Sequence, residues 1–222
     1  MHDLLGDRNT RREQGQIIIH GNKIQHHSDF GVVVDATSRD QNGNPVAGPV
    51  RNLRELNTFN LVPGATLTNN IVAHNGGGGI ELVGGANATG DQSPVSLARL
   101  VNNTIVGEDS DVGVSIGENL ARTLLNNVIS SFATGIQLDI ASEHVVVGGT
   151  VYHNNAQDLQ VLTGGNQIGL GAFPIVLDST DILFVGADND NFYPASGSEV
   201  IDSSIQSFQD GSVMTTVKEA FG

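Results

Sequence analysis

The stretch Val101-Asn102-Asn103-Thr104-Ile105-Val106 is matched, one repeat later, by Leu125-Asn126-Asn127-Val128-Ile129-Ser130. Both contain a triplet made of an asparagine, any residue and an isoleucine. The same triplet stands at Asn22-Lys23-Ile24 and Asn69-Asn70-Ile71, with a degenerate copy at Gly149-Thr150-Val151. Internal self-similarity of this kind is typical of repeat architectures. We therefore interpret this part of the chain as about five repeated coils.

A second landmark, a glycine followed by an apolar residue, comes after each copy of the triplet. The offset between the two landmarks is nearly constant, whereas the distance from one copy to the next shrinks along the chain. A constant offset predicts two strands joined by the same turn in every coil. The variable distance predicts that the loop at one other corner differs in length from coil to coil. The landmarks are Gly31-Val32, Gly79-Ile80, Gly113-Val114, Gly135-Ile136 and, without the glycine, Asp158-Leu159.

Apolar residues alternate with polar ones after these landmarks, which is the pattern of a strand buried on one face. A third strand in each coil is predicted at residues 17–19, 65–67, 97–101, 123–125 and 145–147. Coils with three short strands close when successive coils pair in parallel, about 4.8 Å apart. The prediction is an all-β parallel β-helix, a solenoid with three short strands per coil. A β-sandwich is the alternative, because short strands and frequent turns also suit it.

Composition agrees with a thin solenoid core. The 222 residues include 28 glycines and no tryptophan, and aromatic residues make up only 5%. With ten Lys and Arg residues and a net charge of −14, the chain lacks the basic clusters that nucleic-acid binding requires. There is no cysteine, so disulfides and thiolate metal sites are excluded. No apolar run is long enough for a membrane span.

The two stretches quoted first, each followed by Gly-Val or Gly-Ile, resemble coils of the pectate-lyase-like right-handed β-helix superfamily over about residues 15–161. The string from Asp190 to Asp202 is similar to the segment that closes many bacterial surface β-helix repeat proteins. The resemblance implies one domain over 1–222, with an inserted loop at about 37–63 and a closing segment at about 181–222 that forms a terminal cap. It also implies a fragment of a longer secreted or cell-surface protein, whose export signal lies upstream because Met1-His2-Asp3-Leu4 has no signal-peptide character.

The resemblance further implies a structural role for the recurrent asparagines. In this superfamily such residues stack inside the solenoid, and their amides hydrogen-bond one coil to the next. The residues expected in this ladder are Asn22, Asn69, Asn103 and Asn127.

One acidic string is a candidate metal site. In Asp188-Asn189-Asp190-Asn191 the two carboxylates stand two residues apart and alternate with amides, which is the oxygen-rich chemistry that calcium prefers. We expect calcium as the one possible cofactor here. The alternative is a solvated acidic turn, since the string lacks the remaining ligands of a complete calcium loop.

Two arginines are the candidates for catalysis. Lyases of the superfamily use an Arg or Lys as the base that removes a proton from a uronate sugar. Arg99 and Arg122 stand at nearly equivalent places in successive coils, which predicts that they lie one above the other. The alternative is that both are ordinary solvated side chains.

These observations predict a non-catalytic extracellular module that serves as a structural, adhesive or carbohydrate-contacting surface. Its expected partners are polysaccharides or other cell-surface components. An enzyme that acts as a polysaccharide lyase on uronate-containing polymers is the alternative, and a purely architectural spacer is the third hypothesis. An enzyme predicts arginines and carboxylates converging in a cleft, whereas a spacer predicts neither these nor exposed aromatic residues.

Overall fold

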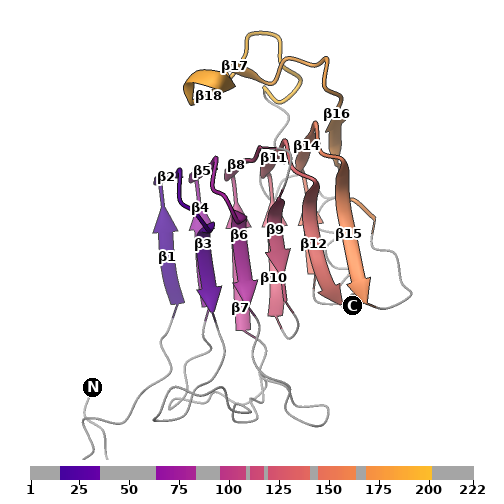
Figure 1. Cartoon of the computed structure of the whole chain (residues 1–222). Coiled ribbons are helices and arrows are strands. Elements are labelled where there is room, and N and C mark those ends of the chain that lie inside the picture. Colours follow the sequence, from indigo (N-terminus) through magenta and orange to yellow (C-terminus); the bar gives the residue numbers. More distant parts are fainter. Residues whose placement is uncertain are drawn as a thin grey trace, which may run out of the picture.

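The structure of the protein, a computed structural model, describes residues 16–35, 64–83, 96–108, 111–117, 120–140, 145–163 and 169–201. The predicted inserted loop at 37–63 lies outside these residues. Within them, three parallel sheets run side by side along the stacking direction (Figure 1). The prediction of an all-β parallel β-helix with three strands per coil is confirmed.

Each sheet takes one strand from every coil. Sheet A consists of β1 (Gln16–His20), β4 (Gly64–Thr68), β7 (Ser96–Val101), β10 (Leu120–Leu125) and β13 (Val145–Gly148). Sheet B consists of β2 (Lys23–Gln25), β5 (Ile71–Ala73), β8 (Thr104–Val106), β11 (Val128–Ser130), β14 (Val151–His153) and β16 (Ile175–Leu177). Sheet C consists of β3 (Phe30–Asp35), β6 (Gly78–Val83), β9 (Val112–Ile116), β12 (Thr134–Ile140) and β15 (Gln157–Thr163).

The core is a stack of aliphatic side chains that point inward from equivalent positions. Leu67, Leu100 and Leu124 occupy one register position of sheet A and are completely buried. Ile105 and Ile129 do the same in sheet B. Because parallel strands keep identical register from coil to coil, like side chains stack on like and the core stays narrow, as the low aromatic content predicts.

Tyr152 is the largest exception, since it is fully buried in the fifth coil. Its hydroxyl donates to Leu170 O at 3.2 Å. Burial, and secondarily the negative charge of Asp158, raises the pKa of the Tyr152 phenol above its ordinary value. The side chain therefore packs as a neutral group.

The recurrent glycine is required by close contact between coils. A Cβ atom on Gly79 would lie 2.3 Å from Gly113 O, and one on Gly113 would lie 2.5 Å from Gly135 O. No side chain fits into such a gap. The landmark seen in the sequence thus marks the corner where sheet C begins.

The chain turns back along the outside of the solenoid after β16. Residues 178–201, called the C-terminal strap below, include β17 (Phe184–Gly186), the short 3-10 helix η1 (Ala187–Asn189) and β18 (Asn191–Pro194). The strap begins in a turn where the hydroxyl and amide of Thr180 donate to Asp178 Oδ1, and these bonds lower the pKa of the Asp178 carboxyl. Figure 1 shows β17 and β18 beyond sheet B.

The strap covers the outer face of sheet B with apolar side chains. Leu183 packs with Val151 and Leu177 near the last coil, and Phe192 packs with Ala73 and Val106 near the first coils. This placement differs from the expected terminal cap: the described part of the closing segment lies along a side of the solenoid, and residues 202–222 lie outside the described chain. The physical reason is the apolar outer face of sheet B, which the sequence pattern did not distinguish from the core.

Candidate functional site

An asparagine ladder joins the coils at the corner between sheets A and B. Asn103 Oδ1 accepts hydrogen bonds from the backbone N of Asn70 at 3.1 Å and from its Nδ2 at 2.9 Å. Asn103 Nδ2 donates to Leu67 O at 2.9 Å. Asn127 repeats these contacts, accepting from Asn103 and donating to Leu100 O. The amides therefore satisfy backbone groups that the turn would otherwise bury without partners.

One predicted ladder residue is wrong. Asn22, Asn103 and Asn127 lie in the ladder, but the second coil contributes Asn70 and not Asn69. Asn69 is the preceding turn residue, with φ of 54°, and it matches Asn102 and Asn126 in the left-handed conformation that asparagine tolerates. The repeat triplet in the second coil is Asn70-Ile71-Val72 and not Asn69-Asn70-Ile71, because Val72 fills the core position that Ile105 fills in the next coil.

The two candidate arginines do not form a pair. Arg122 is opposite Ala98 in the register of β10 and β7, and Arg99 is opposite Thr123. Neighbouring positions on a strand face opposite sides, so Arg99 is exposed whereas Arg122 is only 2% exposed. Arg122 Nη2 donates to Gly117 O. The prediction that Arg99 and Arg122 lie one above the other is therefore wrong, because the two arginines are one residue out of register.

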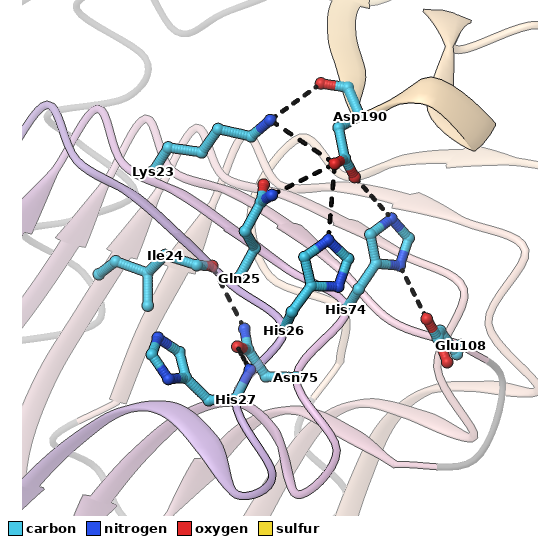
Figure 2. Close-up of polar contacts among 9 residues, drawn as sticks. All are labelled: Lys23, Ile24, Gln25, His26, His27, His74, Asn75, Glu108 and Asp190. Atoms are coloured by element: carbon cyan, nitrogen blue, oxygen red, sulfur yellow. Dashed lines mark hydrogen bonds and ion pairs between the residues drawn. The ribbon is translucent and has the colours of Figure 1, made fainter.

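The two candidate calcium ligands point to different surroundings. Asp188 is exposed in η1, whereas Asp190, with φ of 56°, turns its carboxylate toward the first two coils. In Figure 2, side chains from these coils converge on Asp190, namely those of Lys23, Gln25, His26 and His74. The contacts come from β2 and from the turns that follow β2 and β5.

Asp190 is held mostly by basic and amide groups. Gln25 Nε2 donates to Asp190 Oδ2 at 3.2 Å. Lys23 Nζ lies 3.4 Å from the backbone O of Asp190 and 3.9 Å from its Oδ2. His26 Nε2 lies 3.6 Å from Oδ2, and His74 Nε2 lies 3.5 Å from Oδ1. Lys23 already places a positive charge beside this carboxylate, which disfavours a calcium ion there, and the calcium site at Asp188 and Asp190 stays a prediction.

His74 is the central residue of this group. Its other ring nitrogen, Nδ1, lies 3.4 Å from Glu108 Oε1, so the ring stands between two carboxylates (Figure 2). The His74 side chain is 17% exposed, and Phe192 lies against it at a centroid distance of 5.7 Å. We call Lys23, Gln25, His26, His74, Glu108 and Asp190 the Asp190 cluster.

The histidine geometry does not fit a shared metal ion. The rings of His26 and His74 stack with centroids 5.7 Å apart and an interplanar angle of 13°. The nitrogen lone pairs of nearly parallel rings lie in nearly parallel, separated planes, which disfavours one ion shared by the two rings. Among the residues that the structure describes, no group of three or more His, Asp and Glu side chains is arranged to hold a metal.

A second polar contact fixes the other end of the strap. Ser130 Oγ lies 2.8 Å from His153 Nδ1 on the neighbouring strand, and His153 Nε2 lies 3.2 Å from Asp181 O. The Asp181 carbonyl can only accept, so Nε2 donates this hydrogen bond. Ser130 is buried. The strap is thus attached at two points, one near each end of sheet B.

Sequence reasoning missed the pairing of His26 with His74. The missed signal was positional: both residues directly follow the short strand of sheet B in their coils, and both have positive φ, 59° and 52°. Equivalent positions in adjacent coils must stack. The partner Asp190 could not be found in this way, because nothing in the repeat pattern indicates that the strap folds back over the first coil.

The comparisons with known proteins agree with this architecture. A family model described as a right-handed β-helix region matches residues 10–173, most of the chain. The protein therefore belongs to the right-handed β-helix region family. No curated protein matches the sequence significantly. No solved structure matches it significantly either.

No helix in the described part of the chain is both long and apolar enough to cross a membrane.

Proposed function

We propose that the protein is a non-catalytic extracellular β-helix module that contacts polysaccharide through the outer face of sheet C. The observation that carries the proposal is a row of polar side chains at one register position of this sheet. Four of the five strands contribute a partly exposed polar residue in register, Glu81, Ser115, Gln137 and Gln160, and the first strand contributes the exposed Val33.

This row supplies the kind of groups that bind sugar hydroxyls. Gln137 Nε2 donates to Gln160 Oε1 at 3.2 Å, which holds the two amides side by side. Each amide has both donor and acceptor groups, so one hydrogen bond between them leaves further bonding capacity. Parallel strands place such groups about 4.8 Å apart along the solenoid. A rigid row of this kind suits an extended, hydroxyl-rich polymer, since little side-chain entropy is lost on binding.

The net charge favours a neutral or basic polysaccharide. The chain carries a formal charge of −14, and Glu81 lies in the row itself. Long-range repulsion would oppose a polymer of uronate sugars. The separation of Arg99 from Arg122 removes the pair on which the lyase hypothesis rested.

The test is titration of the protein with neutral, basic and uronate-containing polysaccharides by isothermal calorimetry. Binding is expected for the neutral or basic polymers. Replacing both amides, Gln137→Ala with Gln160→Ala, should weaken that binding about tenfold or more, because each hydrogen bond contributes about 1 kcal/mol.

Arg99→Ala on sheet A is the matched control, since Arg99 is exposed on a different sheet, and it should bind as the unaltered protein does. Equal affinity of the double variant and the unaltered protein would sink the sheet C assignment. Absence of binding to every polymer would contradict carbohydrate contact altogether. Release of unsaturated sugar products would overturn the non-catalytic proposal.

A further inference from the structure

We propose that the outer side of the C-terminal strap is a docking surface for an extended, basic segment of a partner protein, which adds as a third strand to β17 and β18. This inference is independent of polysaccharide binding, because it concerns a surface over sheet B and not sheet C.

The strap carries apolar side chains on both of its sides. Phe184 and Phe192 contact each other edge to face on the inner side, with ring centroids 5.5 Å apart, and Phe192 packs against sheet B. The next residue of each strand faces the opposite side, and there Val185 is 61% exposed and Tyr193 is 78% exposed. Ile182, which is 73% exposed, comes just before β17. Sheet B accounts for the inner apolar residues but not for these outer ones.

The two outer side chains lie on one small sheet with open edges. β17 and β18 are antiparallel, with Phe184 opposite Pro194 and Gly186 opposite Asn191. In the described part of the chain this sheet has only two strands, so each strand has one edge with no further strand beside it. Such an edge offers backbone N–H and C=O groups to an incoming strand. A strand added there places every second side chain beside Val185 or Tyr193.

The charge of the strap selects a basic partner. Residues 178–201 contain no Lys or Arg. Lys23 lies beside one of their five carboxylates, that of Asp190. The other four acidic residues are exposed: Asp178, Asp181, Asp188 and Glu199. A second copy of this chain, with the same carboxylates and a net charge of −14, would be repelled, as would an acidic membrane surface. Lys and Arg side chains that flank an apolar strand would be attracted.

The strap is held at both ends, which favours binding. The Asp190 cluster joins it to the first two coils, and the hydrogen bond from His153 Nε2 to Asp181 O joins it to the fifth coil. A surface that is already ordered loses little conformational entropy when a partner binds. Because an isolated two-stranded sheet is only marginally stable, a third strand should also stabilise the strap.

The test uses a short acetylated peptide of alternating leucine and lysine as the probe, titrated by isothermal calorimetry in EDTA so that no divalent cation screens the carboxylates. Binding is expected, and it should weaken as salt is added, because ions screen the attraction between opposite charges. A peptide of alternating leucine and glutamate should not bind. A leucine–lysine peptide with methylated backbone nitrogens should bind about tenfold more weakly or less, because it cannot donate the hydrogen bonds of a strand.

Substitutions of exposed side chains locate the surface. Val185→Ser with Tyr193→Ser should weaken binding of the leucine–lysine peptide about tenfold or more, because the apolar contacts are lost. Ile18→Ser is the matched control, since Ile18 is an apolar residue of sheet A that is 72% exposed, and it should bind as the unaltered protein does. Gln137→Ala with Gln160→Ala, which alters sheet C, should also leave peptide binding unchanged.

A measurement on the unaltered protein guards against a folding defect in the double serine variant. Hydrogen exchange of residues 183–194 should slow when the leucine–lysine peptide is added. No binding of this peptide, equal binding by the double serine variant, similar affinity for the leucine–glutamate or the methylated peptide, or strap exchange that the peptide leaves unchanged would each overturn the proposal. A dimer in sedimentation equilibrium that the double serine variant abolishes would assign the surface to a second copy and overturn it as well.

Discussion

Individual asparagines determine how tightly one coil is joined to the next. The ladder runs through Asn22, Asn70, Asn103 and Asn127 and then meets Thr150, which occupies the equivalent place in the fifth coil. Thr150 is completely buried, and its hydroxyl has no hydrogen-bond partner in the described part of the chain. The shorter threonine side chain does not reach across to Asn127, so the ladder stops one coil early.

Extending the ladder should stabilise the protein. In Thr150→Asn, the new Oδ1 is positioned to accept from Asn127, and the new Nδ2 to donate to Leu124 O, as Asn127 donates to Leu100 O. We expect a gain of about 1 kcal/mol in the free energy of unfolding, measured by urea denaturation. Thr150→Val is the control and should be nearly neutral, because it removes only an unpartnered hydroxyl. Loss of stability in Thr150→Asn would show that the fifth coil has no room for the amide.

The repeat pattern predicts the strands well but not which of two adjacent residues faces the core. Repeated landmarks predicted the strands, because each core position recurs once per coil. The ladder position in the second coil was misassigned, because Asn69 and Asn70 are chemically identical and only the position of Val72 in the core separates them. Arg99 and Arg122 were misaligned for the same reason: a shift of one residue on a strand reverses the face, and sequence spacing alone does not fix it.

Strands of sheet C begin at a corner where coils approach most closely. A side chain there meets backbone and buried core atoms that have little freedom to move: a Cβ on Gly113 would lie 2.5 Å from Gly135 O and 2.8 Å from Ile129 Cγ2. Backbone in a parallel sheet cannot move without breaking the ladder on both sides. Glycine is therefore needed at this position because the neighbouring coil leaves no room for a Cβ atom, not because the backbone of Gly113 has an unusual conformation.

Gly113→Ala should therefore destabilise the protein by about 2 kcal/mol, as expected for overpacking against fixed atoms. Thermal unfolding followed by circular dichroism would measure it. Gly169→Ala is the matched control, since nothing lies within 4 Å of a Cβ at that position. The control should change the stability by less than about 0.5 kcal/mol. Equal effects of the two substitutions would contradict the close approach of the coils.

The strap is the element that sequence reasoning placed least well. Its composition resembles a closing segment, but its position depends on long-range contacts between residues more than 160 positions apart, such as Gln25 with Asp190. Repeat patterns contain information about neighbours in adjacent coils. They contain none about a segment that folds back across all of them.

The whole molecule differs from a simple solenoid because of this strap. In a solenoid each coil contacts only its neighbours, so stability is a sum of local terms and the ends can unfold separately. Here Leu183 packs near the last coil and Phe192 near the first coils. One segment thus couples coils that do not touch, which should make unfolding more cooperative.

Removal of the strap should separate the unfolding of the two ends. We expect a chain ending at Leu177 to unfold in transitions that no longer coincide when followed by backbone circular dichroism and by fluorescence of Tyr152 in the fifth coil. The reference is the full chain with Tyr193→Phe, in which Tyr152 is the one remaining tyrosine and the two transitions should coincide. Coincident transitions in the shortened chain would mean that the coils are cooperative without the strap.

The attachment of the strap at both ends of sheet B also constrains how this protein can change in length. Solenoids commonly grow by duplication of a coil, because each new coil stacks on the last. An additional coil between the first and the fifth would move Lys23, Gln25 and His26 about 4.8 Å away from Asp190. The strap would then have to lengthen at the same time, so the number of coils and the length of this segment can change only together.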